Sequence, residues 1–163
     1  MHKIRKIPPV CLFAALIKLF LGRLKLHRNN IGLNIRTGNA DKYAIFRHIS
    51  ISPIYHEKDN CVFFVIFKFA RLTNKANKIA SVIPMLLIAG HPGFMQKIYA
   101  INPENGYWQG LYQWKSITHL EAYKKSFVFR MMNKRALIGS VQFDMVKNYQ
   151  LDKLLNDYGS NSK

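Results

Sequence analysis

The residues best suited to chemistry in this sequence lie between positions 99 and 123, where tyrosines and tryptophans precede a histidine and one tyrosine follows it. Trp108, Tyr112 and Trp114 are spaced by even numbers of residues, so a strand would place all three on one face. His119 follows, and imidazole is the side chain best able to accept a proton near neutral pH. The pattern has two interpretations: proton transfer in an aromatic pocket, or ordinary packing of a sheet or dimer interface beside a solvent-facing histidine.

Motifs of the common enzyme classes are absent from the sequence. It contains no C-x-x-C, H-E-x-x-H, P-loop or G-x-G-x-x-G pattern. The six histidines show no metal-ligand spacing, so we predict no metal site. Cys11 and Cys61 each lie in an apolar run, and a disulfide scaffold would need more cysteines. A reducing cytoplasm is therefore the simplest location. His91 comes directly before a Pro-Gly turn and is interpreted as structural.

The charge of the chain is strongly unbalanced, with 25 Lys and Arg against 8 Asp and Glu and a formal net charge of +17. Such an excess favours anionic partners, either phospholipid or nucleic acid, unless it only reflects a basic overall composition. Proteins that bind single-stranded nucleic acid stack bases on exposed aromatic residues. The phenylalanines of segment 61–70 instead form one unbroken apolar run. Nucleic acid is therefore the disfavoured partner.

The amino-terminal segment combines positive charge with apolar residues, since eight basic and no acidic residues fall within the first 40 positions. Residues 9–26 are predicted to form a helix with Lys18, Gly22 and Lys25 on one face. Only eight apolar residues precede Lys18, too few for a transmembrane span, and the cleavage site of a secretory signal is absent. An interfacial helix fits better, and packing on the protein's own core or a second subunit is the alternative. We expect a cytoplasmic protein, and the two hypotheses for residues 9–26 are packing on the protein itself or a second subunit and contact with the anionic inner face of the membrane.

Residues 61–146 predict the element order β-α-β-β-α-β. Strands are expected at 61–70, 94–101, 107–115 and 139–146. One helix is expected after Thr73, shortened or kinked by Pro84, and a second from 118 to 134 behind a capping box of Thr118 and Glu121. Asn105-Gly106 indicates a hairpin turn. This order is typical of the α+β, ferredoxin-like fold, an antiparallel sheet with both helices on one face. A second copy of the sheet could cover the other face, which predicts a homodimer.

The remaining residues are assigned to a preceding extension and a following tail. Shorter strands are expected at 31–36 and 43–51, with a loop at 52–60. We therefore divide the chain into a basic helical and strand extension (1–60), a ferredoxin-like domain (61–150) and a polar tail (151–163) that carries one short helix.

Turn and packing residues of the central domain carry a family resemblance. They are His91–Tyr99, the turn Asn102–Gly106, Gly110–Trp114 and Leu120–Tyr123. These segments resemble a monooxygenase family of the dimeric α/β-barrel superfamily, which includes antibiotic-biosynthesis monooxygenases and haem-degrading enzymes. The resemblance covers about residues 61–150 and implies a dimeric α/β barrel with a ligand cavity between each sheet and its helices.

The resemblance also implies an activity, the oxygenation of a small apolar or aromatic molecule without metal or organic cofactor, with haem or flavin left open. A polar side chain would remove a phenolic proton in an apolar pocket so that the carbanion can meet oxygen. For this chemistry we predict two catalytic residues, His119 and Tyr112, and four substrate-binding residues: Tyr99, Trp108, Trp114 and Tyr123. The asparagine, tryptophan and histidine of haem-degrading relatives have no matching positions here. The alternative function is a non-catalytic homodimer that binds a lipid or quinone-like ligand at an anionic membrane surface.

Overall fold

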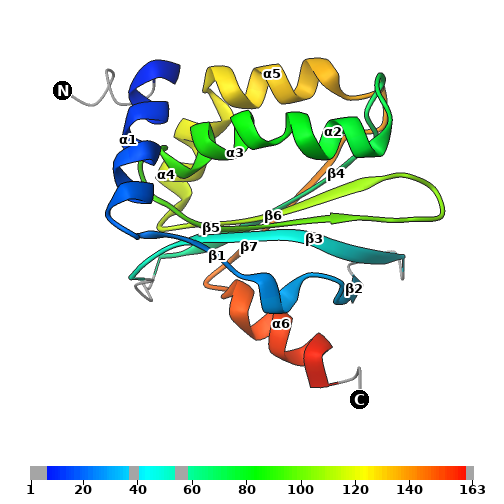
Figure 1. Ribbon diagram of the computed structural model, residues 1–163. Helices are drawn as coiled ribbons and strands as arrows, with labels where there is room; N and C mark the ends of the chain where they lie inside the picture. Colours follow the sequence, from blue (N-terminus) through cyan, green and yellow to red (C-terminus); the bar gives the residue numbers. More distant parts are fainter. Residues whose placement is uncertain (1–6, 37–40, 54–58, 161–163) are drawn as a thin grey trace.

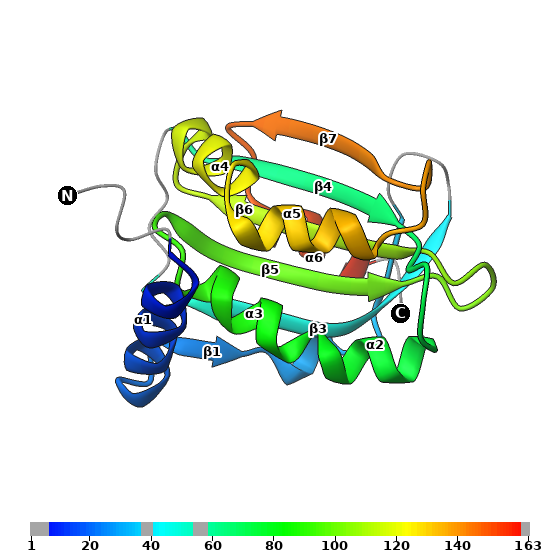
Figure 2. The same ribbon diagram turned by 90° about the horizontal axis from the view of Figure 1, so that it is seen from above.

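A seven-stranded antiparallel sheet forms the centre of the protein, in the order β1-β3-β5-β6-β4-β7, with β2 paired to the first residues of β3. The computed structural model describes residues 7–36, 41–53 and 59–160, with side chains as far as residue 155. Residues 54–58 of the predicted loop lie outside the described residues. Figure 2 shows the strands from above. They are β1 (Leu24–Leu26), β2 (Asn34–Arg36), β3 (Lys42–Ile51), β4 (Cys61–Phe67), β5 (Phe94–Ile101), β6 (Trp108–Trp114) and β7 (Gln142–Lys147).

The middle of this sheet confirms the predicted β-α-β-β-α-β order. Strands β5, β6, β4 and β7 are neighbours in space in this order, although β4 precedes β5 in the sequence and β7 follows β6. The hairpin between β5 and β6 is also confirmed, because the Asn102 amide donates to the Tyr107 carbonyl at 2.8 Å. Gly106 in this turn has a φ of +74°, a conformation that glycine adopts at little cost. The protein therefore has the predicted α+β, ferredoxin-like fold.

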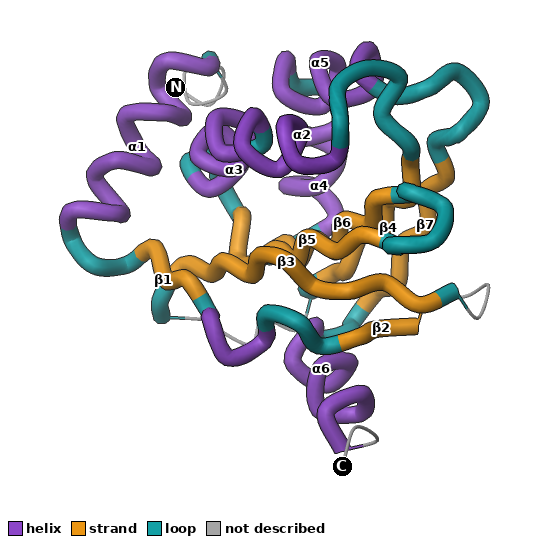
Figure 3. The backbone as a smooth tube through the Cα atoms, turned by 45° about the vertical axis from the view of Figure 1, so that its right-hand side comes forward, coloured by secondary structure: helices purple, strands orange, loops and turns teal. Residues whose placement is uncertain are grey.

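The helices lie in layers on both faces of the sheet (Figure 1). On one face lie α2 (Asn74–Ala80), α3 (Val82–Ala89), α4 (Ile117–Lys124) and α5 (Phe127–Arg135), with α1 (Pro8–Phe20) beside α3. On the opposite face lies α6 (Leu151–Ser160), together with the one-turn 3₁₀ helix η2 (Arg28–Asn30) (Figure 3). Each face of the sheet consequently has its own apolar core.

The amino-terminal helix is shorter than the predicted range 9–26. It ends at Phe20, and Gly22 adopts a left-handed φ of +64° that turns the chain back. Lys25 then lies in β1, opposite Ser50 of β3, so it shares no helical face with Lys18. The Lys18 ammonium donates to the Ala89 carbonyl at 2.7 Å and so joins α1 to the end of α3. Residues 24–26 pair with β3, so their backbone N–H and C=O groups form sheet hydrogen bonds in place of the helical hydrogen bonds of a longer helix.

The predicted helix 118–134 is divided into α4 and α5, and its capping box is wrong. The Ser116 hydroxyl accepts from the His119 amide at 3.4 Å and begins α4, which leaves Thr118 inside the helix. The Ser126 hydroxyl accepts from the Phe129 amide at 3.3 Å and begins α5. A serine that caps amide groups favours a new helix start. The predicted Thr73 cap is confirmed, since its hydroxyl accepts from the Ala76 amide at 3.3 Å.

The two faces of β6 carry different side chains, as the alternation predicts. Trp108, Tyr112 and Trp114 belong to the core under the helix layer, whereas Leu111 belongs to the core on the α6 side. The apolar residues on the α6 side include Val62, Ile98, Leu111, Leu151 and Leu154. The aromatic stripe is therefore covered by helices of its own chain, and α6 covers part of the face that we assigned to a second copy. The homodimer itself stays a prediction.

Candidate functional site

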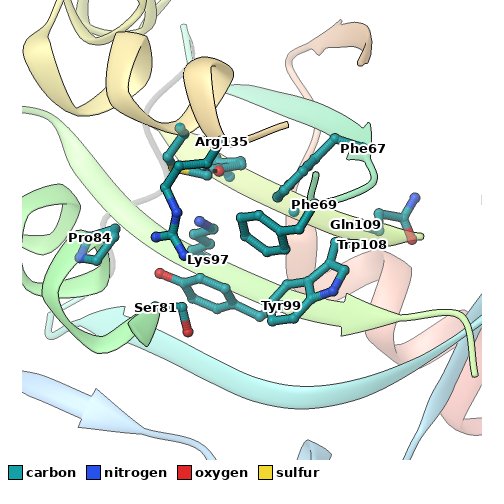
Figure 4. A pocket seen from close by; sticks show the side chains of 12 residues that line it. Phe67, Phe69, Ser81, Pro84, Lys97, Tyr99, Trp108, Gln109 and Arg135 are labelled. Carbon is teal, nitrogen blue, oxygen red and sulfur yellow. Dashed lines mark hydrogen bonds between the residues drawn. The ribbon is translucent and has the colours of Figure 1, made fainter. Parts of the chain in front are cut away.

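The candidate site is a small, partly open pocket between the helix layer and the middle of the sheet. Figure 4 shows the Phe67, Phe69 and Trp108 rings on one side and the nitrogen-bearing ends of Lys97 and Arg135 on the other, with the Tyr99 ring beside Lys97. The residues that line it come from β4, β5, β6 and the helices α3 and α5, with Phe69 and Ser81 beside them. They are Phe67, Phe69, Ser81, Pro84, Lys97, Tyr99, Trp108, Gln109, Gly110, Tyr112, Met132 and Arg135.

The sheet forms the floor of the pocket, and the pairing of β5 with β6 determines which side chains lie there. Lys97 lies opposite Tyr112 and Tyr99 lies opposite Gly110, so these side chains share the helix-facing side of the sheet. A Cβ atom at position 110 would lie 2.7 Å from the Tyr112 ring. The absence of a side chain at Gly110 therefore lets the Tyr112 ring lie across the strand.

Lys97 is the most unusual residue of the floor, because it is a lysine with only 1% of its surface exposed. Its Nζ atom lies 3.8 Å from the centre of the Tyr99 ring and 4.0 Å from that of Tyr112. No hydrogen bond or ion pair of this ammonium group occurs among the described residues. Burial, with the nearby positive charge of Arg47, lowers the pKa of Lys97 well below its ordinary value.

Two arginines add positive charge around this floor. Arg47 donates to the Ser81 hydroxyl at 2.8 Å, and its guanidinium lies 5.4 Å from the centre of the Tyr99 ring. Arg135 donates to the Asn77 side-chain oxygen at 2.9 Å and lies 5.0 Å from the centre of the Phe69 ring. No Asp or Glu is among the described residues that line the pocket. Its electrostatics therefore favour a ligand with negative charge.

Three of the predicted site residues, Tyr99, Trp108 and Tyr112, line the pocket. The Trp108 indole donates to the Asn74 side-chain oxygen at 3.0 Å, which fixes one wall. The Tyr99 hydroxyl is buried without a hydrogen-bond partner among the described residues. Burial raises the pKa of Tyr99 and of Tyr112 well above the usual range. Both phenols therefore keep their protons, and neither is available as a phenolate to accept a proton.

Tyr123 lies behind Tyr112 rather than in the pocket lining, with 5.7 Å between the two ring centres. Both hydroxyls point to the sulfur of Met132, at 4.0 Å from Tyr112 and 3.8 Å from Tyr123. Trp114 stacks on Tyr123 with 4.8 Å between ring centres, farther from the pocket. Among the described residues these two rings serve packing, and their role in substrate binding stays a prediction.

His119 is placed at the first turn of α4 and does not line the pocket. Its Nδ1 atom lies 2.9 Å from the Ser116 hydroxyl, and its ring lies against Gly93. Gly93 has a φ of +76°, and a side chain there would collide with the imidazole. His119 is therefore absent from the lining of the pocket to which Tyr112 belongs, and its catalytic role stays a prediction.

Sequence reasoning missed Lys97, Arg47 and Arg135, which bring charge to the pocket. For Lys97 a signal was present, since it is two residues before Tyr99 and four before Ile101 in an otherwise apolar strand. The two arginines gave no such signal, because helix and strand packing bring them to the pocket from distant positions.

Metal sites and membrane-spanning helices were also sought among the described residues. Within residues 7–36, 41–53 and 59–155, no three His, Cys, Asp or Glu side chains gather in a way that could hold a metal ion. None of the described helices is sufficiently long and apolar to cross a membrane.

Comparisons with known proteins support the fold at low sequence identity. No family model and no curated protein matches the chain. A heme-degrading enzyme from Listeria monocytogenes aligns with a TM-score of 0.52 and 13% identity, covering 83% of this chain and 92% of that one. An uncharacterized ferredoxin-fold protein related to antibiotic biosynthesis monooxygenases, from the same species, gives 0.50 and 12% over 83% and 88%.

A third structure extends beyond this chain. An anthrone oxidase-like protein aligns with a TM-score of 0.48 and 14% identity over 68% of this chain, which spans about half (55%) of that protein. The strand order, the helix layer and the first two alignments agree on the architecture. The chain thus has a ferredoxin-like fold, which the sequence resemblance implied and which it shares with these two Listeria proteins.

Proposed function

We propose that this protein is a monooxygenase-like enzyme that oxygenates a small apolar or aromatic molecule in the pocket between its sheet and helices. The observation that carries the proposal is the composition of that pocket. Aromatic rings of Phe67, Phe69 and Trp108 form walls for a flat apolar molecule, and Arg135 places positive charge beside it. The fold supports the same function, because two proteins that share it are described as heme-degrading and as related to antibiotic biosynthesis monooxygenases.

The chemistry is balanced when the substrate supplies its own electrons. Removal of a proton from an activated CH₂ group, such as one next to a phenol-bearing aromatic ring, leaves a carbanion stabilised by the ring. Its attack on O₂ forms a C–O bond, and loss of water from the resulting peroxide leaves a carbonyl. One CH₂ and one O₂ thus become one C=O and one H₂O, with O₂ as the oxidant.

The pocket contributes what such a reaction needs from a protein. Its apolar walls exclude water from the carbanion and strengthen electrostatic interactions inside. Its fixed positive charges stabilise the oxyanion that develops during proton removal and attack on O₂. Arg47 and Arg135 are held by hydrogen bonds to Ser81 and Asn77, so this charge is positioned before the substrate binds.

Oxygen uptake by the purified full chain, measured with a panel of hydroxylated aromatic compounds and quinols, tests the proposal. Replacing a pocket wall, Trp108→Leu, is expected to raise KM about 2- to 10-fold, because one aromatic contact is worth about 0.5 to 1.5 kcal/mol. Phe127→Leu, on the exposed side of α5, is the matched control and should leave KM unchanged. The proposal fails if no compound supports oxygen uptake or if both variants behave alike.

The roles predicted for His119 and Tyr112 are tested in the same assay. His119 lies outside the pocket lining, so His119→Ala should leave turnover unchanged if the pocket is the site. A large loss of kcat in that variant would instead favour the predicted catalytic histidine. Tyr112→Phe removes only the hydroxyl that points to Met132 and should change kcat little.

A further inference from the structure

We infer that the outer side of α1 docks on an anionic phospholipid membrane, with the helix lying in the plane of the headgroups. The inference goes beyond the proposed function and does not depend on it, because α1 lies at the edge of the molecule and does not line the pocket (Figure 1). It rests on a division of the helix into two sides, one buried against the protein and one exposed.

The inner side of α1 carries small residues that pack closely on the end of α3. Cys11 and Ala15 are both buried. A Cβ atom at Gly90, directly after α3, would collide with the backbone of Cys11, so the absence of a side chain there allows the close contact. On the same side the Lys18 ammonium donates to the Ala89 carbonyl at 2.7 Å. These contacts hold α1 in one orientation, so its opposite side has to face outward.

The outer side of α1 is apolar and has no charge. Lys18 is the only charged residue between positions 8 and 20, and its ammonium is engaged on the inner side. Positions 13, 16, 17 and 20 have the i, i+3, i+4 and i+7 spacing of a single helical stripe. They are Phe13, Leu16, Ile17 and Phe20, all exposed, with exposed fractions of 66% at Phe13 and 89% at Phe20. A large exposed apolar stripe is typical of a surface that binds a membrane or another protein.

Exposed basic residues lie beside this stripe. Arg23, Lys25 and Arg28 follow α1 in the turn, in β1 and in η2, and each is exposed. Figures 1 and 2 both place β1 next to α1, and the two elements are in contact. No acidic residue occurs within the first 40 positions, so the local charge is strongly positive. We call the four apolar residues of the stripe and these three basic residues together the α1 surface.

The basic residues favour an anionic bilayer over the other partners that an apolar stripe could bind. In a twofold contact through α1 the same surface of both copies meets. Arg23, Lys25 and Arg28 would then face their own copies, with no carboxylate between positions 7 and 36 to pair with them. A nucleic acid would pair with the basic residues but leave Leu16 and Ile17 in water. An anionic bilayer binds both parts, since phosphates meet the basic residues and acyl chains meet the stripe.

The length of α1 fits docking in the plane of the membrane. The helix has 13 residues, so at 1.5 Å per residue it is about 20 Å long, whereas the hydrocarbon core of a bilayer is about 30 Å thick. Its inner side stays on α3, which leaves only the outer side for lipid. The two hypotheses for the amino-terminal segment therefore apply to different sides of one helix: packing on the protein to the inner side, and membrane contact to the outer side.

The test is co-sedimentation of the full chain with phosphatidylcholine vesicles that contain or lack phosphatidylglycerol. The wild type is expected to bind the vesicles with phosphatidylglycerol at least about tenfold more tightly, because each lysine or arginine near an anionic surface strengthens binding about fivefold. Phe13→Ser combined with Phe20→Ser should weaken this binding at least about tenfold, since it removes the apolar rings. The matched control is Ile79→Ser combined with Ile138→Ser, two exposed residues in α2 and between α5 and β7, which should bind as the wild type does.

The charge of the α1 surface is tested separately. Replacing Arg23, Lys25 and Arg28 together by glutamine should weaken binding to the phosphatidylglycerol vesicles at least about tenfold and leave binding to pure phosphatidylcholine unchanged. The matched control removes three positive charges from exposed positions in α2, α5 and β7. Its replacements are Lys75→Gln, Lys134→Gln and Lys147→Gln. The control should bind as the wild type does, because at about 0.1 M salt a charge more than about 10 Å from the bilayer is largely screened.

Three results would overturn the inference. The first is a wild type that does not prefer the phosphatidylglycerol vesicles, and the second is a control variant that loses as much binding as its α1 counterpart. The third is a dimer, found by sedimentation velocity without lipid, that dissociates in the variant with Phe13→Ser and Phe20→Ser, because it would assign the α1 surface to a second copy. Circular dichroism checks that each variant keeps the wild-type fold, and Phe20→Ser alone provides the comparison if the double variant is misfolded.

Discussion

Replacing Lys97 by methionine should stabilise this protein at neutral pH, although the side chain lies in the middle of the sheet. Methionine is unbranched, apolar and flexible, so it can occupy the space of the lysine stem without bringing a charge into the core. The lysine is destabilising because burial lowers its pKa in the folded state, while the unfolded chain keeps the ordinary value of 10.5.

The sign and size of the effect follow from proton linkage. Between the lowered folded pKa and 10.5, the unfolded state binds more protons at position 97 than the folded state. The free energy of unfolding of the wild type therefore rises with pH through this window, by up to about 1.4 kcal/mol per pH unit. Below the folded pKa, Lys97 is charged in both states, and the full cost of burying the charge lowers the free energy of unfolding. The two ring contacts of the ammonium return about 0.5 to 2 kcal/mol, which a large fall in pKa exceeds.

The assay is urea unfolding from pH 6 to pH 10, followed by the fluorescence of the buried Trp108 and Trp114. The quantity to plot is the free energy of unfolding of Lys97→Met minus that of the wild type, because other titrating groups cancel in this difference. We expect a positive difference at pH 7 that falls toward zero as the pH approaches 10.5. Lys147→Met, at an exposed position, should give a difference close to zero at every pH.

A difference that is independent of pH would refute this reasoning, because it would mean that Lys97 titrates alike in the folded and unfolded states. A wild type that is more stable than Lys97→Met at pH 7 would show that the ring contacts outweigh desolvation.

Three further predictions concern other parts of the molecule. Burial lowers the pKa of His48, whose ring nitrogens contact Asn30 and Gln96, from 6.5 to about 4. Acidification from pH 6.5 to 4 should therefore lower the free energy of unfolding by up to about 3 kcal/mol through this residue. Urea unfolding of His48→Gln should lack this contribution. Leu151→Ala should lower the free energy of unfolding by about 2 to 5 kcal/mol, measured in urea at pH 7, because Leu151 is fully buried under the sheet. If the exposed side of α1 contacts membranes, Phe20→Glu should weaken co-sedimentation of the protein with anionic phosphatidylglycerol vesicles, because the Phe20 side chain is 89% exposed. The control is Ile138→Glu, a side chain 99% exposed between α5 and β7, which should leave co-sedimentation unchanged. Equal binding by both variants would exclude contact between α1 and the membrane.

The sequence predicted most of the central fold because its signals are local. The alternation of β6, the Asn105-Gly106 turn and the Thr73 cap each depend on residues a few positions apart, and all three are confirmed. Helix ends were less predictable, since Ser116 and Ser126 compete with Thr118 as caps and the sequence does not rank them. The early end of α1 depends on β3, a partner that the sequence of the helix does not reveal.

The candidate site was predictable only in its aromatic part. Alternation places Trp108 and Tyr112 on one face of β6, and the sequence alone determines that much. Which face meets the helices, and which charges arrive there from β3 and α5, depends on packing between segments far apart in the chain. The tertiary structure alone buries Lys97 between two rings and leaves His119 outside the pocket, because desolvation and distance are properties of the folded molecule and not of residue order.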